Sequence, residues 1–311
     1  MNTEISQKLQ DISYYFNLGV IRDYKRAGGK NRNYYISTNK GQYFIKMLTS
    51  EEKENIEKEV AYLNTLKEHQ FPIAAFIKAS SNSYVYNDGA YLAVALHKLE
   101  GAEPEVNENI CRVIGINLAK LSLITIENLP SKQHWLESHY LPKSIDIAKK
   151  KFGESALQQT LKEYTLLQHF KPEAFPQSIV HGDLDPSNCL FIGEILSALL
   201  DWQESGIGAS ILDFGMTVLG FCFVKETTPV FTVKFHPDFY GSLFDGYSQV
   251  RLFSPHEQEY IETAVKYAGL TMQAWFMLHW DTYFSGQVFE EHKLPYFQYG
   301  LHSWKLTSCA S

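Results

Sequence analysis

Apolar and polar residues alternate with two different periods along the first hundred residues. The opening stretch, MNTEISQKLQDISYYF, places its apolar side chains on one face of an expected helix. β-Branched and aromatic residues then dominate VIRDYKR and NYYISTNKGQYFIKML, and the Asn-Lys-Gly at 39–41 predicts a hairpin turn. Helical spacing returns over residues 50–69, and two further strands are expected at 71–79 and 90–99. This order predicts a small sheet with one long helix.

The pattern changes within LEGAEPEVNE, where Gly101 and Pro104 interrupt the strand periodicity. From Asn107 onward helical spacing dominates, except in one β-rich stretch, SIVHGDLDPSNCLFIGEILSALLDW. No internal repeat and no low-complexity segment is present in the sequence. We therefore predict an α+β fold with a small N-terminal lobe at residues 1–100 and a larger, mainly helical C-terminal lobe at residues 101–311.

The β-rich stretch has the pattern strand, loop, strand, turn, strand. A hairpin brings the ends of its two strands together, so the loop before its first strand and the residue after its second are expected to meet. Those positions hold Asp183 and Asn188 in the loop and Asp201 after the second strand. An Mg-nucleotide needs such a set, with carboxylate and amide oxygens for the cation and a base for an incoming hydroxyl.

Two aspartates compete for the role of metal ligand. Asp213 opens the tripeptide Asp-Phe-Gly, which marks a metal site in kinases, whereas Asp201 is followed by Trp202. Asp201 is eighteen residues after Asp183, at the end of the hairpin, and Asp213 is thirty residues after it. Asp213 also begins an apolar run with helical spacing, which favours a helix cap or a first-turn acid. The spacing therefore favours Asp201 as the ligand.

The segments VHGDLDPSNCLF and LLDWQESGIGASILDFG resemble the aminoglycoside phosphotransferase, choline kinase and homoserine kinase group of small-molecule kinases. The resemblance is highly specific over residues 178–216, fair over 28–66 and weak elsewhere. It implies a protein-kinase-like fold, with nucleotide bound in the N-terminal lobe and catalysis and substrate binding in the C-terminal lobe. The implied activity is an ATP-dependent, Mg²⁺-requiring transfer of phosphate to an alcohol.

The resemblance also implies a role for each polar residue of the loop. Asp183 is the expected catalytic base, and Asn188 and Asp201 are the expected magnesium ligands, with a hydrogen bond to Asp183 as the alternative role of Asn188. His181 is expected to pack beneath the loop rather than transfer protons. Asp185, which precedes a proline, is expected to form a turn.

A kinase-like N-terminal lobe requires a lysine on a central strand, reaching the nucleotide phosphates, and a helix glutamate that orients it. The strand YFIKML supplies Lys46 among apolar neighbours. Glu59 is the expected partner because its surroundings resemble the family's helix, and Glu57 and Glu54 are the alternatives. These residues predict one half of a nucleotide site.

The turn between the first two strands is expected to cover the phosphates. Gly28 and Gly29 allow a close approach of the backbone to a phosphate, and Lys30 or Arg32 could add positive charge. Two glycines in a hairpin turn also fit a plain turn, so this assignment depends on the rest of the set.

Charge and cysteine content narrow the function classes. The net charge of -7 and the absence of any basic run disfavour nucleic-acid or membrane partners. Four separated cysteines without a Cys-x-x-Cys pair predict a reduced, cytoplasmic protein without disulfides or a zinc site. The N-terminus resembles no signal peptide, and no apolar run is long enough for a transmembrane helix.

The acceptor is expected to be a small alcohol or amino alcohol. Gly182 occupies the position of the arginine that reads a phosphorylated activation loop in protein kinases, and no activation segment follows Asp201. Aminoglycosides, choline or ethanolamine, and homoserine stay open as acceptors, and a catalytically silent nucleotide-binding protein is the alternative from another class. An aromatic and acidic cage for a cation is a further possibility, although aromatic residues at helical spacing more often form core. Its members would be Trp275, Trp280, Tyr283, Phe284, Asp281, Glu290 and Glu291.

Overall fold

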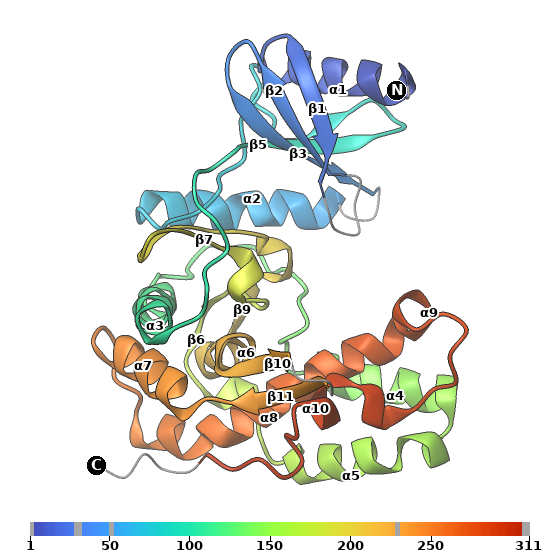
Figure 1. The fold of residues 1–311 in the computed structure, drawn as a ribbon, viewed down its shortest axis with the longest axis vertical. Helices are drawn as coiled ribbons and strands as arrows, with labels where there is room; N and C mark the ends of the chain where they lie inside the picture. The colour runs from blue at the N-terminus through green and yellow to red at the C-terminus, as the bar shows by residue number, and fades with distance from the viewer. Residues whose placement is uncertain (1–2, 28–32, 50–52, 228–230, 307–311) are drawn as a thin grey trace. The chain divides into compact units, whose positions relative to one another are not determined.

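The computed structural model describes residues 3–27, 33–49, 53–227 and 231–306. Contacts group the chain into two compact units. The N-terminal unit consists of Met1–Ala102, Leu190–Ile192 and Ser197–Gln203, and the C-terminal unit contains the other residues. The α+β prediction is confirmed, because the first unit contains a five-stranded antiparallel sheet and the remainder is mainly helical (Figure 1).

The sheet of the N-terminal unit has the strand order β1-β2-β3-β5-β4, and each neighbouring pair is antiparallel. The predicted hairpin is present as β2 and β3, and β3 is the middle strand of the five. Lys46 therefore lies on a central strand, opposite Val94 of β5. The strands are β1 (Ile21–Arg26), β2 (Tyr34–Thr38), β3 (Gln42–Leu48), β4 (Tyr86–Asn87) and β5 (Leu92–His97).

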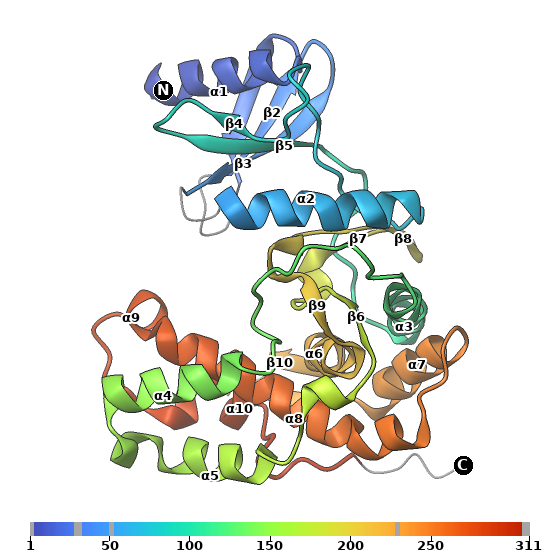
Figure 2. The ribbon, with the colours of Figure 1, turned by 180° about the vertical axis from the view of Figure 1, so that it is seen from behind.

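Two helices cover the two faces of this sheet, α1 (Thr3–Tyr15) on one and α2 (Lys53–Glu68) on the other (Figure 1, Figure 2). Leu9 and Ile12 of α1 belong to one buried cluster with Ile45 of β3. Side chains alternate between the faces of a strand, so Lys46 faces the side of α2. Because the fully buried apolar side chains of β3 pack on the α1 side of the sheet, its one lysine faces the α2 side.

One predicted strand is wrong. Residues 71–79 form isolated bridges, one of them between Ile73 and Leu199, and no named strand. The carbonyl of Pro72 accepts a hydrogen bond from the Leu199 amide at 2.8 Å, but a proline offers no N–H in return and interrupts a ladder. The fifth strand is instead β4, which pairs with β5 across the Asn-Asp-Gly turn.

The C-terminal unit is built around helix α6, whose residues are all buried except Gly220. Figure 2 shows α6 enclosed by other helices of the unit. No helix in the described part of the chain is both long and apolar enough to cross a membrane. The helices are α3 (Glu108–Ser122), α4 (Tyr140–Phe152), α5 (Gln158–Leu167), α6 (Ser210–Cys222), α7 (Pro237–Ser248), α8 (Pro255–Leu278), α9 (Trp280–Tyr283) and α10 (Pro295–Gln298).

The described residues also contain three two-stranded sheets. The predicted hairpin is present as β7 (Cys189–Ile192) and β8 (Ile195–Leu199). Strand β6 (Gln177–Val180) pairs with β9 (Gly206–Ala209), and a second hairpin forms from β10 (Phe223–Thr227) and β11 (Phe231–Phe235). The sequence pattern predicted neither β9 nor this second hairpin.

Helices α3 and α7 cross where each carries a glycine. A Cβ atom at Gly115 would lie 2.1 Å from the carbonyl oxygen of Leu243, and one at Gly246 would lie 2.1 Å from that of Arg112. We expect Gly115→Ala to lower the free energy of unfolding by about 1–3 kcal/mol, since the helix backbones must separate. Gly241→Ala on α7, where a Cβ has open space, is the control and should be neutral or stabilising by roughly 0.5–1 kcal/mol. Urea denaturation of both variants checks this; equal stabilities would contradict the close approach.

Candidate active site

The loop between β6 and β7, residues 181–188, is fixed at both ends by short-range contacts. Pro186–Asn188 forms a single 3₁₀ turn, and the Asp185 side chain caps it by accepting from the Ser187 and Asn188 amides at 2.8 and 3.2 Å. Asp185 therefore has the turn-forming role that was expected of it. The cap therefore fixes the end of the loop at which strand β7 begins.

Asp183 and Asn188 are brought together within this loop. The Asn188 amide nitrogen donates to the Asp183 carbonyl oxygen at 2.7 Å and lies 3.4 Å from its carboxylate. The buried His181 ring accepts from the Asp183 amide at 3.3 Å through Nδ1. The alternative contact predicted for Asn188 is thus present, and His181 supports the loop from beneath.

Asp213 holds the loop from the side of helix α6. Its two carboxylate oxygens accept from the backbone amides of His181 and Gly182 at 2.8 and 2.9 Å. It lies in the first turn of α6 and is fully enclosed, and burial raises the pKa of its carboxyl to about 6. The Asp-Phe-Gly aspartate therefore stabilises the backbone just before Asp183, and it lies in the first turn of the helix, as expected.

The stability of the fold is expected to depend on pH through Asp213. Its pKa is raised from 3.8 to about 6 in the folded protein, so the folded state binds this proton more tightly. The contribution of the Asp213 carboxyl to the free energy of unfolding is complete when the pH is below its ordinary pKa of 3.8, and it is lost as the pH rises through about 6. It amounts to roughly 3 kcal/mol at most.

Urea unfolding of the wild type and Asp213→Asn across this pH range tests the linkage. The variant should be less stable, because its amide NH₂ would face one of the two backbone donors. The stability difference should shrink as the pH rises through the pKa of Asp213. A difference that does not change with pH would show that Asp213 does not titrate there.

Gly182 is required by the geometry beside Asp183. Its φ of 83° favours glycine, and a Cβ would lie 2.4 Å from the carbonyl oxygen of Glu204. The indole Nε1 of Trp135 donates to the Gly182 carbonyl oxygen at 2.5 Å. An arginine cannot occupy this position, which gives a physical reason for the difference from protein kinases.

The N-terminal unit contributes Lys46 and Asp201. The Lys46 ammonium lies 3.1 Å from the Asp201 carboxylate, which is 54% exposed, whereas the lysine side chain is 11% exposed. Asp201 has a φ of 50°, the left-handed conformation that non-glycine residues rarely adopt. Trp202 anchors the next position, since its buried indole donates to the Leu199 carbonyl at 3.1 Å. The hairpin end is therefore held so that the Asp201 carboxylate reaches solvent.

The candidate glutamates of helix α2 differ in how deeply they are buried. Glu59 is 4% exposed, whereas Glu57 is exposed. A buried carboxylate requires a cation or hydrogen-bond donors, so burial favours Glu59, and its pairing with Lys46 stays a prediction. The side chain of Glu54 lies outside the described residues, as do Gly28, Gly29, Lys30 and Arg32.

The predicted magnesium ligands belong to different units, Asn188 to the C-terminal and Asp201 to the N-terminal unit. Their convergence on one cation stays a prediction. Within the described residues, no three His, Cys, Asp or Glu side chains are placed to hold a metal. The expected site has only two protein ligands, one of them an asparagine, so it is not a group of this kind. One amide oxygen and one exposed carboxylate are oxygen donors of the kind Mg²⁺ takes, with phosphate oxygens and water completing its shell. The residues therefore fit magnesium.

A cavity of about 320 Å³ lies within the C-terminal unit. Its walls include Trp135 and Glu204, which both lie against the Gly182 backbone, and Tyr140, Lys143 and Trp275. The sequence analysis missed all of these except Trp275, because the segment SKQHWLESHY has no motif and no regular period. The pairing of Trp135 with the catalytic-loop backbone could be found only from the fold.

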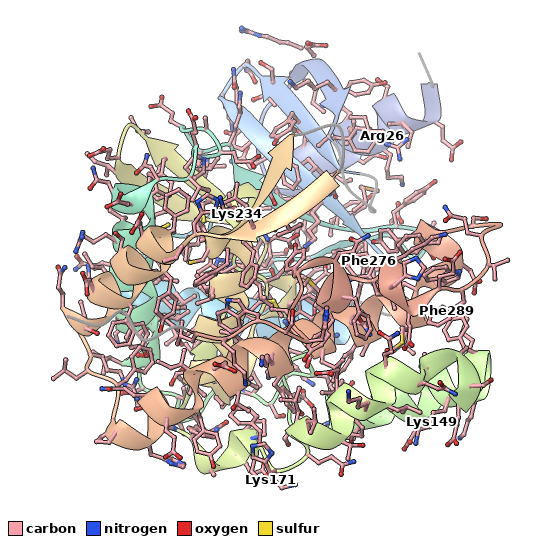
Figure 3. All side chains as sticks on the ribbon, turned by 60° about the horizontal axis from the view of Figure 1, so that its bottom comes forward. Arg26, Lys149, Lys171, Lys234, Phe276 and Phe289 are labelled. Carbon is pink, nitrogen blue, oxygen red and sulfur yellow. The ribbon has the colours of Figure 1, made fainter. Side chains whose placement is uncertain are left out.

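The structure favours packing over a cage for part of the aromatic and acidic set. Trp280 is buried and stacks on Phe284 with centroids 4.2 Å apart, and its ring centroid lies 4.9 Å from that of Phe289, which is labelled in Figure 3. All three acids have partners: Asp281 pairs with Lys151 at 2.8 Å, Glu290 pairs with Lys293 at 2.8 Å, and Glu291 accepts from amides in the first turn of α5 at 3.0 Å. Trp280 therefore packs in the interior, and Trp275 is the member of the set that lines the cavity.

The chain is similar to known proteins in sequence and in fold. A sequence profile described as the phosphotransferase enzyme family (APH) matches residues 25–254. The homoserine kinase of Methylocella silvestris is 26% identical over 293 residues, which cover 89% of this chain and 87% of the relative. The homoserine kinase of Zymomonas mobilis is 25% identical over 270 residues, covering 82% and 79%.

Solved structures share the fold at low identity. The amicoumacin kinase hAmiN, in complex with AMP-PNP, Ca²⁺ and Ami, has a TM-score of 0.66 at 14% identity, covering 97% of this chain and 96% of that chain. The choline kinase LicA of Streptococcus pneumoniae has a TM-score of 0.64 at 17% identity, covering 97% and 100%.

Proposed function

Because the chain belongs to the phosphotransferase enzyme family, we propose that it transfers the γ-phosphate of ATP to a hydroxyl of a small molecule bound beside the 181–188 loop. The observation that carries the proposal is the support given to Asp183 by Asn188, His181 and Asp213. Phosphoryl transfer depends mainly on positioning and charge stabilisation, and this loop is built to position one carboxylate.

Asp183 acts as the base that orients the acceptor. The bond between the γ-phosphorus and the ADP oxygen breaks, the acceptor oxygen forms a new bond to phosphorus, and the hydroxyl proton passes to the Asp183 carboxylate. Asn188 restrains that carboxylate through its amide nitrogen. His181 and Asp213 hold the adjacent backbone, so the carboxylate meets the acceptor without reorganisation of the loop.

Asn188 and Asp201 would hold magnesium through an amide oxygen and a carboxylate oxygen. When bound, the cation neutralises charge on the ATP phosphates. Lys46, now 3.1 Å from Asp201, would contact the same phosphates, and the buried Glu59 would orient it. Gly28 and Gly29 would cover the phosphates from the first hairpin turn.

Two classes of acceptor follow from the relatives. The sequence relatives are named homoserine kinases, whereas structural neighbours are named for antibiotics and for choline. The higher sequence identity to the homoserine kinases, 26% against 14% for the amicoumacin kinase, favours a metabolite kinase over an aminoglycoside kinase. A catalytically silent nucleotide-binding protein is disfavoured because Lys46, Asp183, Asn188 and Asp201 are all present.

An ADP-release screen with Mg-ATP tests the proposal. The panel contains L-homoserine, choline, ethanolamine, and the antibiotics kanamycin and spectinomycin, and mass spectrometry of each positive reaction identifies the phosphate ester. We expect one acceptor to yield a phosphomonoester in a magnesium-dependent reaction. Binding of Mg-ATP without any acceptor-dependent ADP release across an extended alcohol panel would favour the silent protein instead.

A further inference from the structure

The cavity of the C-terminal unit lies against the backbone of the catalytic loop. Trp135 donates to the Gly182 carbonyl, and the Glu204 carbonyl lies in the space that a Gly182 side chain would need. Both residues also line the cavity. The cavity therefore lies against the backbone of the residue that precedes Asp183.

The size of the cavity limits its ligand. Its volume of about 320 Å³ is at the lower end of the roughly 300–1,000 Å³ typical of ligand pockets. A small metabolite fits within these walls, whereas a multi-ring antibiotic would extend out of the open side of the cavity. Trp135 and Trp275, whose rings meet edge to face with centroids 6.1 Å apart, supply an apolar wall.

Helix α4 supplies a polar wall. Tyr140, Lys143 and Ser144 are three and four residues apart, so they lie on one face of the helix, and all three line the cavity. Lys143 has no ion-pair partner within the described residues 3–27, 33–49, 53–227 and 231–306. Lys143 is an exposed residue, so its ammonium stays solvated and is available to an anionic group of a ligand.

Two acidic residues line the cavity, and each also has another interaction in the described residues. Glu137 accepts from the His134 amide at 2.9 Å and lies 2.7 Å from the His139 ring. Glu204 comes from another element, the 3₁₀ turn Trp202–Glu204. The cavity thus presents a cation from α4 and a carboxylate from the segment before β9.

We propose that this cavity binds the acceptor as a zwitterion, with Lys143 contacting a carboxylate and Glu204 contacting an ammonium group. The inference rests on the proposed function, because it places the acceptor hydroxyl toward Asp183. A polycationic aminoglycoside would place like charges against Lys143, and choline would leave Lys143 without an anion. A hydroxy amino acid offers a carboxylate to Lys143 and an ammonium group to Glu204, and it fits within the cavity.

Binding measurements separate this inference from catalysis. Trp135 and Trp275 line the cavity, so intrinsic tryptophan fluorescence reports ligand binding in the presence of Mg²⁺ and AMP-PNP. The ligands are L-homoserine, aminopropanol without the carboxylate, γ-hydroxybutyrate without the ammonium group, and kanamycin. We expect L-homoserine to bind at least about tenfold more tightly than each of the others, the factor for one charge-assisted hydrogen bond.

Two variants assign the charges. Lys143→Met should weaken L-homoserine binding about tenfold or more and leave aminopropanol binding within about twofold, and Glu204→Gln should weaken L-homoserine but not γ-hydroxybutyrate. Lys150→Met, an exposed lysine on the same helix that does not line the cavity, is the control and should bind like the wild type. Unchanged thermal unfolding of all three variants excludes misfolding.

The outcomes distinguish the two proposals. Absence of L-homoserine binding, tighter binding of kanamycin, or affinity for either singly charged analogue within about threefold of L-homoserine would overturn the zwitterion site. Selective binding without phosphate transfer would instead overturn the proposed function and leave the site intact. Phosphate transfer to an uncharged alcohol, without dependence on Lys143, would uphold the function and overturn the site.

Discussion

Asp183→Asn is expected to lower turnover by roughly 10²- to 10⁴-fold, the contribution of a positioned general base. The amide can still accept a hydrogen bond from the loop, but it cannot take the proton of the acceptor hydroxyl. The backbone contacts of His181, Gly182 and Asn188 do not depend on this carboxylate alone. Nucleotide binding should therefore persist while the rate of ester formation falls.

Asp185→Asn is the matched control for this variant. It changes a carboxylate two residues away, in the same loop, to an amide that also caps a turn well. Turnover of the Asp185→Asn protein should stay within a few-fold of the wild type. Near-normal ester formation by Asp183→Asn, measured with the acceptor found in the screen, would remove Asp183 from the catalytic role.

Asp201→Asn is expected to abolish the stabilisation of the protein by Mg-ATP. Asparagine tolerates the left-handed backbone that this position adopts at a φ of 50°, so the substitution tests the charge with little added strain. In the wild type, ligand at one hundred times its dissociation constant should add about 2.7 kcal/mol to the free energy of unfolding. A large loss of affinity reduces this to near zero.

Thermal shift with ATP, with and without Mg²⁺, measures this effect. The wild type should gain stability mainly when Mg²⁺ is present, and the variant should respond equally to both conditions. Asp213→Asn is a useful comparison, because it alters loop stability without removing a proposed metal ligand. A full magnesium-dependent shift in Asp201→Asn would assign the cation to another residue.

The features that carry strong local patterns could be predicted from the sequence. Strand β3 alternates around Lys46, and helix α6 follows from the apolar spacing after Asp213. The hairpin β7–β8 follows from two apolar runs around Gly193. In each element the residues that define the structure are close together in the chain.

The features that depend on distant packing could not be predicted. Strand β9 contains Gly206 and Gly208, which give no strand signal; a Cβ at either position would lie 2.1 or 3.0 Å from the ring of His134. Residues 71–79 look like a strand by composition, but Pro72 interrupts the ladder and the segment bridges to Leu199 instead. These constraints come from residues more than seventy positions apart.

The proposed acceptor cavity belongs to the same group. Trp135 and Lys143 have no motif, and tertiary packing places both on the cavity wall, with Trp135 bonded to the Gly182 carbonyl. Local patterns therefore located the proposed phosphate-transfer residues, whereas the residues proposed to set specificity are brought together by tertiary packing.

A crystal structure with a non-hydrolysable ATP analogue and Mg²⁺ tests the central claim most directly. It should show one cation bound by the Asn188 amide oxygen and the Asp201 carboxylate, with Asp183 facing the γ-phosphate and Asp213 still bonded to the loop backbone. A cation coordinated by Asp213, or Asp201 remote from every phosphate-bound ion, would contradict the account.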